Sequence, residues 1–149
     1  MKIFVDGDGC PVKQEIYRVA KRCGLRVHVV ANKWMQTLDD PSVEMVVVSH
    51  GLDAADDWIV EHAAAGDVVV TADIPLAARC LKKDAFVIGP TGRRFTDGDI
   101  GSALASRELM AHLRESGVMT GGPAPFTDRD RSKFLQALDA AIQQSRRRR

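Results

Sequence analysis

Short apolar runs alternate with amphipathic segments through the first part of the chain. Runs rich in β-branched residues predict strands at 2–5, 27–31, 44–48, 68–71 and 85–88. Between them, apolar residues recur at helical spacing from Pro11 to Gly24, over 53–65 and over 74–83. Almost wholly apolar strands that alternate with helices are typical of a parallel sheet covered on both faces. The pattern therefore predicts an α/β fold, a three-layer sandwich around a mainly parallel sheet of about five strands.

The remainder of the chain predicts helices. One helical pattern covers 99–116, and a Gly/Pro-rich connection follows at 121–125. Thr127 with Asp130 three residues later resembles a capping box, and the segment after it has one apolar face. That face needs a surface to pack on, and the α/β body is the simplest one. We therefore expect one domain over 1–145, with a helical C-terminal portion from about 97 to 145.

Composition indicates one ordinary domain with little net charge. The chain has 149 residues, 45% of them hydrophobic and 28% charged, and its formal net charge is +1. Four of the 21 basic residues are the arginines at 146–149, so the body carries 17 basic and 20 acidic residues, a net of −3. A strongly basic DNA-coating protein is thereby excluded. The terminal arginine run is expected to be a disordered, solvated tail.

The cysteines and the N-terminus point to the cytoplasm. Cys10, Cys23 and Cys80 form no CxxC pair and are expected to be reduced thiols. The strand pattern begins at Lys2, without the basic and long apolar segments of a signal peptide. No apolar run approaches the roughly 18 to 20 residues of a membrane span. We expect a cytoplasmic protein that does not bind membranes.

Acidic residues gather where the predicted strands end. They are Asp6 and Asp8 after the first strand, Asp53, Asp56 and Asp57 after the third, and Asp73 after the fourth. The carboxyl ends of parallel strands meet at one edge of the sheet, where ligands bind. Clustered carboxylates stay ionised when a divalent cation lies between them, and oxygen ligands favour Mg²⁺ or Mn²⁺. The expected cofactor is therefore Mg²⁺ or Mn²⁺.

Each acidic cluster also has a purely structural explanation. Asp73 precedes Pro75 by two residues and would cap a helix, and the acids at 53–57 would complement the positive end of theirs. Asp6 and Asp8 fit this explanation less well, because capping one helix does not require two acids in a Gly-rich loop. The shared position of the three clusters at strand ends favours a metal site.

Four segments resemble a known family. They are Phe4–Pro11, Gly51–Ile59, Gly66–Ala77 and the stretch from Gly121 to Ser132. Together they resemble the YaiI/YqxD-type family of uncharacterised bacterial proteins over nearly the whole chain except the arginine tail. That family is grouped with the PIN-like domains, which are related to the NYN and flap-type nucleases. The resemblance implies a PIN-like fold with an acidic, metal-binding pocket.

Two of these segments are also similar to metal-ligand segments of more distant families. Ala55–Ile59 resembles the Ala-Asp-Asp-x-Ile stretch of flap-type nuclease domains attached to bacterial DNA polymerases. Val69–Asp73 resembles the strand ending in Thr-x-Asp that PIN nucleases share. Those relatives carry an acid two residues before their Asp pair, whereas Asp53 stands three residues before Asp56. Which of the three acids Asp53, Asp56 and Asp57 reach a metal is therefore open.

The resulting hypothesis is metal-dependent hydrolysis of phosphodiester bonds, in RNA rather than DNA. The expected catalytic residues are Asp6, Asp8 and Asp73, with Asp8 orienting water. The expected metal ligands are Asp6, Asp53, Asp56, Asp57 and Asp73. Candidates for binding substrate phosphates are Lys13, Lys33, Arg93 and Arg94.

Two other functions remain open at this point. Asp6 and Asp8 after a strand resemble the Asp-x-Asp start of haloacid-dehalogenase-like phosphatases, in which the first Asp is a nucleophile and the second a general acid. Cys10 stands where that family usually has Thr or Val, which weakens this reading. The other alternative is a non-catalytic RNA-binding or adaptor protein that keeps a structural ion and binds partners through its arginine tail. The sequence leaves the oligomeric state open, a homodimer included.

Overall fold

A computed structural model describes residues 1–49, 51, 53–98, 100 and 126–148. The helix expected over 99–116 and the Gly/Pro-rich connection at 121–125 lie outside the described residues, apart from Ile100. No helix in the described ranges is long and apolar enough to cross a membrane.

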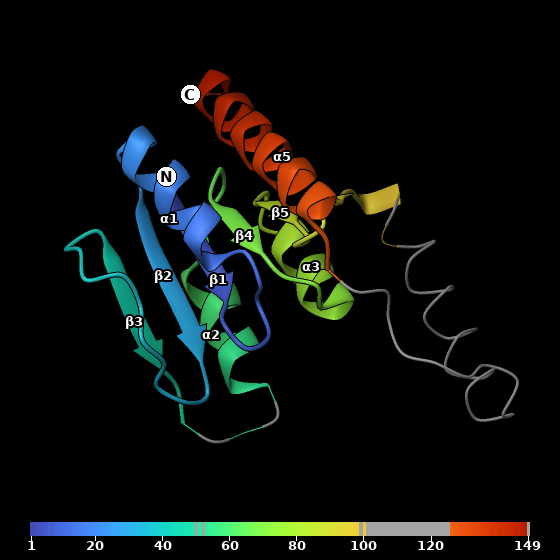
Figure 1. Cartoon of the computed structure of the whole chain (residues 1–149). Coiled ribbons are helices and arrows are strands. Elements are labelled where there is room, and N and C mark those ends of the chain that lie inside the picture. Colours follow the sequence, from blue (N-terminus) through green and yellow to red (C-terminus); the bar gives the residue numbers. More distant parts are fainter. Residues whose placement is uncertain (50, 52, 99, 101–125, 149) are drawn as a thin grey trace, which may run out of the picture.

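A six-stranded sheet forms the centre of the molecule (Figure 1). Its strands follow the spatial order β3-β2-β1-β4-β5-β6, and every neighbouring pair is parallel except β5 and β6. The predicted α/β class with a mainly parallel sheet is therefore confirmed. The bounds are β1 Lys2–Asp6, β2 Arg26–Ala31, β3 Val43–Val47, β4 Val68–Val70, β5 Phe86–Ile88 and β6 Arg94–Phe95.

The sixth strand is the one that the apolar pattern did not predict. β6 has only two residues, too few to show alternation, and it returns antiparallel to β5 after the tight turn from Gly89 to Gly92. Within that turn, the amide of Gly92 donates to the carbonyl of Gly89. The strand exists because the turn brings it back beside β5.

Helices cover both faces of the sheet. On one face, α1 (Lys13–Cys23) and α5 (Asp128–Arg147) share a core with alternate strand residues such as Ile3 and Val5. On the other, α2 (Ala54–His62) and α3 (Ile74–Leu81) pack around Phe4. Successive residues of a strand point to opposite faces, so a strand covered twice must be apolar throughout. This explains the unbroken apolar runs and completes the three-layer sandwich.

The last helix packs on the body, as its apolar face predicts. Its N-terminus is the expected capping box: Thr127 Oγ1 accepts from the amide of Asp130 at 3.2 Å, and Asp130 Oδ2 accepts from that of Thr127 at 3.0 Å. Phe134 and Leu138 are fully buried against α1 and the sheet. Burying these side chains fixes α5 across the outer face of the sheet (Figure 1).

The arginine run corrects one prediction. Helix α5 continues through Arg147, so the expected disordered tail is wrong for 146–148, while Arg149 lies beyond the described residues. Arg146 Nη2 donates to the carbonyl of Cys23, and the guanidinium of Arg148 lies 5.6 Å from the ring centroid of Phe86. The guanidinium groups of both arginines thus find partners on the body.

Candidate metal centre at the carboxyl edge of the sheet

The register of the central strands brings the first and third acidic clusters together. Val5 of β1 pairs with Val70 of β4, so the next residues, Asp6 and Thr71, are neighbours at the carboxyl edge. A cavity of about 450 Å³ lies at this edge, against the N-terminus of α2. Its lining residues are Asp6, Asp8, Asn32, Asp53, Ala55, Asp56, Asp73 and Pro75. Five of the six predicted acids therefore share one cavity, here called the acidic pocket.

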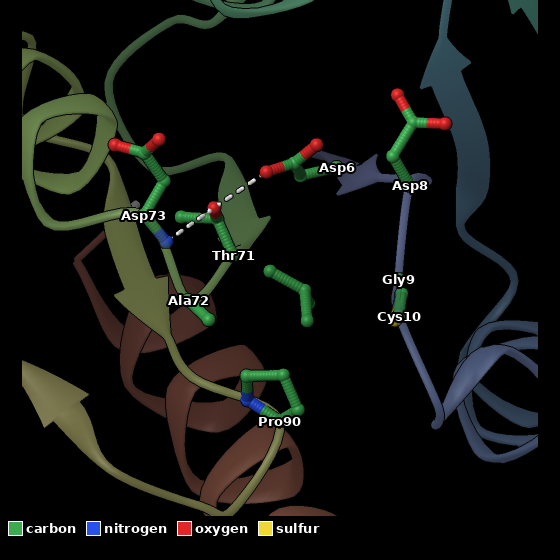
Figure 2. A pocket seen from close by; sticks show the side chains of 9 residues that line it. Asp6, Asp8, Gly9, Cys10, Thr71, Ala72, Asp73 and Pro90 are labelled. Atoms are coloured by element: carbon green, nitrogen blue, oxygen red, sulfur yellow. Dashed lines mark hydrogen bonds between the residues drawn. The ribbon is translucent and has the colours of Figure 1, made fainter. Parts of the chain in front are cut away.

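A buried hydroxyl joins the carboxylate of Asp6 to the backbone of Asp73. Thr71 Oγ1 donates to Asp6 Oδ2 at 2.9 Å and accepts from the amide of Asp73 at 3.0 Å (Figure 2). Thr71 is only 2% exposed, so water does not compete for the hydrogen bonds of its hydroxyl. Asp73 Oδ1 also accepts from the amide of Leu76, which makes Asp73 the N-cap of α3. The capping explanation is thus correct for one oxygen of Asp73, while the residue still lines the acidic pocket.

Thr71 was not assigned a role from the sequence. The signal was present, because this Thr directly follows an apolar strand and stands two residues before an Asp. Figure 2 shows the Asp6 carboxylate between those of Asp8 and Asp73. These three residues also line a smaller adjoining cavity of about 60 Å³, together with Thr71 and Cys10.

The rotation of α2 separates the middle acids. At about 100° per residue, Asp56 and Asp57 lie about 100° apart around the helix, with the N-cap Asp53 between them. Asp53 and Asp56 line the acidic pocket. Asp57 instead forms an ion pair with Arg79 at 2.9 Å and lines a different cavity beside β3. The expected metal-binding role of Asp57 is therefore not supported by its position.

Mutual repulsion and burial change the acidity of the pocket. Burial raises the pKa of Asp6 above its usual value, and the charges of Asp73 and Asp8 add to this, while the Thr71 hydrogen bond opposes it. The pKa of Asp56 is raised to about 6, by burial first and then by the charges of Asp73, Asp6 and Asp53, with Arg79 acting in the opposite direction. No Lys or Arg among the described residues lines this pocket.

Asn32 adds an uncharged oxygen to the same pocket. It follows Ala31, the last residue of β2, so it reaches the carboxyl edge for the same reason as Asp6. Its amide N–H donates to Asp8 Oδ2 at 3.4 Å, while its side-chain Oδ1 is buried without a hydrogen-bond partner. A buried acceptor without a partner is costly, and amide oxygens are ligands for hard cations. Its place just after the apolar run at 27–31 is a sequence signal for a residue at the carboxyl edge.

The side chains of the acidic pocket offer the oxygen atoms that a hard divalent cation prefers, but they are not arranged around one ion position. Every polar side chain that lines the acidic pocket offers oxygen, as Mg²⁺ and Mn²⁺ prefer. Within the described ranges, however, no three Asp, Glu, His or Cys side chains are grouped closely enough to hold an ion. Asp8 and Asp53 are exposed at the rim of the pocket. Coordination would therefore require side-chain rearrangement.

The four cationic candidates lie at different places. Lys13 has a hydrogen bond to the edge of the smaller cavity. Its Nζ donates to the carbonyl of Cys10, which lines that cavity, at 3.1 Å. Lys33 is exposed and follows Asn32. Arg93 lines an adjacent groove, whereas Arg94 lines a separate cavity with Phe86. The structure therefore separates two arginines that are neighbours in sequence.

The family assignment follows from the whole chain. Residues 4–144 match the model of a family described as an uncharacterised bacterial group, the YaiI/YqxD family. The chain belongs to the YaiI/YqxD family. The expectation from the four sequence segments is thus confirmed, whereas kinship of this family with PIN-like nucleases stays a prediction.

Relatives in the YaiI/YqxD family match along most of their length. The chain is 55% identical over 147 residues to a UPF0178 protein of Nitrobacter winogradskyi, covering 99% of this chain and 94% of that one. It is 55% identical over 148 residues to a UPF0178 protein of Rhodospirillum rubrum, covering 99% of each. A UPF0178 protein of Azorhizobium caulinodans is 57% identical over 140 residues, with 94% and 88% covered. No solved structure matches the chain significantly.

Proposed function

We propose that this YaiI/YqxD protein is a Mg²⁺- or Mn²⁺-dependent nuclease that hydrolyses phosphodiester bonds in RNA. The observation that carries the proposal is the acidic pocket, in which five carboxylates and one unpartnered amide oxygen meet without a basic side chain in the described lining. Such a pocket weakens the fold, because the carboxylates repel each other and lose hydration. A bound cation would remove that cost and give the pocket a chemical use.

Asp6 and Asp73 are the residues best prepared to hold a cation. The Thr71 hydroxyl orients Asp6, and the first turn of α3 orients Asp73. Asp56 approaches from α2, and Asn32 contributes an oxygen that has no other partner. Asp53 would complete the metal site by rotating inward from the rim.

The proposed reaction replaces one P–O bond by another. When bound, the cation would lower the pKa of a water molecule and stabilise charge on the leaving oxygen. Asp8, exposed beside both cavities, would accept a hydrogen bond from the attacking water and so orient it towards phosphorus. Thr71 would keep Asp6 in place throughout, since its hydroxyl is tied to both acidic loops.

The test compares Asp6→Asn with the wild-type protein on 5′-labelled RNA in Mn²⁺, with DNA of the same sequence beside it. We expect RNA cleavage by the wild-type protein and a loss of at least about a hundredfold in Asp6→Asn, because one of the best-oriented oxygens is lost. Asp139→Asn is the matched control, since Asp139 lies on α5 and pairs with Arg22 at 2.9 Å. Equal cleavage by wild type and Asp6→Asn would identify a contaminant and overturn the proposal.

The same two proteins, wild type and Asp6→Asn, distinguish the two alternative functions from the proposed nuclease. A phosphatase that uses Asp6 as nucleophile would form a phosphoaspartate, which beryllium fluoride imitates, whereas the proposed hydrolysis forms no covalent intermediate. Binding of beryllium fluoride to the Asp6 carboxylate would favour the phosphatase. An adaptor would bind RNA without cleaving it and would bind as tightly after Asp6→Asn.

A further inference from the structure

A second cavity of about 450 Å³ opens beside the acidic pocket and has the opposite chemistry. We call it the apolar groove, and define it by Ile74, Pro90, Arg93, Phe95 and Phe126. Gly9, Ala72 and Pro90 line both this groove and the smaller acidic cavity, so the two spaces adjoin each other. A ligand with one charged and one flat apolar part could occupy both at once.

The wall formed by the β5–β6 turn is held rigidly. Gly89 N donates to the carbonyl of Arg93 at 2.7 Å, and Gly92 N donates to that of Gly89 at 3.0 Å. Gly92 has φ +89°, and a Cβ there would lie 2.7 Å from the backbone carbonyl of Lys133. Only glycine fits so close to α5 in that conformation. The turn is therefore pressed against the backbone of α5, and the groove does not depend on a loose loop.

The opposite wall is held by an ion pair. The guanidinium of Arg131 lies 5.0 Å from the ring centroid of Phe126, and its Nη1 donates to Glu15 Oε1 at 3.0 Å. Glu15 is buried in α1. This chain of contacts fixes Phe126 at the start of α5, so the groove is preformed, as binding sites for small flat groups usually are.

The position of the groove fits one nucleotide. The acidic residues follow β1 and β4, and Pro90 follows β5, the next strand across. Neighbouring strands are about 4.8 Å apart, so the groove lies about 5–10 Å from the carboxylates. A base lies at a comparable distance from its own phosphate. Arg93 places a cation within the groove, 5.3 Å from the ring centroid of Phe95, where it complements the negative backbone of a nucleic acid.

We propose that the apolar groove receives the base of a nucleotide whose phosphate lies at the acidic pocket. This rests on the proposed function and deepens it, because it defines the substrate as single-stranded. A base inside a duplex is paired and stacked, and it enters such a groove only after it is extruded. The groove is lined by apolar surfaces and aromatic rings, which contact any base, so binding tolerates different sequences.

The experiment uses binding rather than cleavage as its readout. A fluorescein-labelled single-stranded RNA and the same backbone with abasic sites are titrated into the full chain in Ca²⁺, with anisotropy as the measurement. The wild-type protein is expected to bind the RNA about tenfold more tightly than the abasic strand, the range found for one stacked base. Equal binding of the two strands by the wild-type protein would overturn the proposal.

Two variants and one matched control locate the effect. Thr91→Trp fills the groove from its exposed rim and is expected to abolish the preference for bases, and Arg93→Ala to weaken RNA binding severalfold. Arg22→Ala is the control, since Arg22 is also an exposed arginine but pairs with Asp139 at 2.9 Å and does not line the groove. An unchanged preference in a Thr91→Trp protein that melts like wild type would overturn the proposal.

Failure of this inference and failure of the proposed function give different results. Base-dependent binding that Thr91→Trp removes, without cleavage of any RNA, would support the groove and contradict the nuclease. Cleavage that Asp6→Asn abolishes, with equal binding of RNA and abasic strand, would support the nuclease and contradict the groove.

Discussion

The buried Glu15 and the half-buried acids of the acidic pocket have opposite surroundings. At the junction of α1 and α5, Glu15 is 5% exposed, and Arg131 meets its carboxylate at 3.0 Å, with Arg18 at 3.7 Å. At the carboxyl edge of the sheet, Asp6 and Asp56 are partly buried among other acids, and the described lining offers no basic side chain. One region neutralises its acid, and the other leaves its acids unneutralised.

The contrast separates an acid used for packing from acids kept for a ligand. Arg131 also donates to the carbonyl of Pro11, so the ion pair joins the last helix to the loop that leads into α1. At Glu15, therefore, the fold supplies an arginine to a buried carboxylate. The unneutralised charge at the strand ends is therefore a cost that folding alone does not explain.

The largest effect is expected from breaking the neutralised region. Arg131→Leu would leave the buried Glu15 carboxylate with only the distant Arg18, and we expect a loss of about 2 kcal/mol in the free energy of unfolding. The estimate is below that for a fully buried pair because Arg131 is 42% exposed. Arg129→Leu on the exposed side of the same helix is the control. Urea denaturation measures both, and equal stability of the two variants would contradict the comparison.

A smaller effect of opposite sign is expected in the unneutralised region. Asp56→Asn should stabilise the protein by about 1 kcal/mol at pH 7.5 in EDTA, because it removes a charge that burial and neighbouring acids disfavour. The pKa of Asp56 is raised to about 6 in the folded state from an ordinary 3.8. The wild-type protein therefore loses stability relative to the variant as pH rises from about 4 to about 6.

The pH dependence supplies the control for that variant. Well below pH 3.8 the wild-type carboxyl is protonated in both folded and unfolded chains, so the advantage of Asp56→Asn should disappear there. Adding Mn²⁺ at pH 7.5 should stabilise the wild-type protein more than the variant, if the cation binds only the folded site. A variant that is less stable than wild type at pH 7.5 in EDTA would show that Asp56 is neutralised after all.

The smallest effect is expected at the neighbouring acid. Asp57→Asn removes only an exposed ion pair with Arg79, so the free energy of unfolding should change by less than about 0.5 kcal/mol. Mn²⁺ affinity, measured by calorimetry, should equal that of wild type, because Asp57 lies outside the acidic pocket. A severalfold weaker Mn²⁺ affinity would show that Asp57 contributes to the metal site, and would contradict the different roles given to Asp56 and Asp57.

Much of the fold could be predicted because its signals are local. Apolar runs at 2–5 and 68–71 correspond to strands buried on both faces, and the Thr127–Asp130 capping box starts a helix as expected. The two-residue strand β6 has no such signal, since a tight turn and the neighbour β5 create it. The ordered arginines at 146–148 were missed because their partners, such as Phe86, are distant in sequence.

The sequence by itself determined that acids follow several strands of a parallel α/β pattern. Because positions after such strands lie at one edge of the sheet, it also placed the acids at that edge. Only the tertiary structure decided which of them meet. The register of β1 against β4 puts Thr71 beside Asp6, and the rotation of α2 admits Asp56 and turns Asp57 away. Periodicity defines the spacing of residues within one element. The distances between elements depend on packing, which is how Asn32 and the apolar groove came to adjoin the acids.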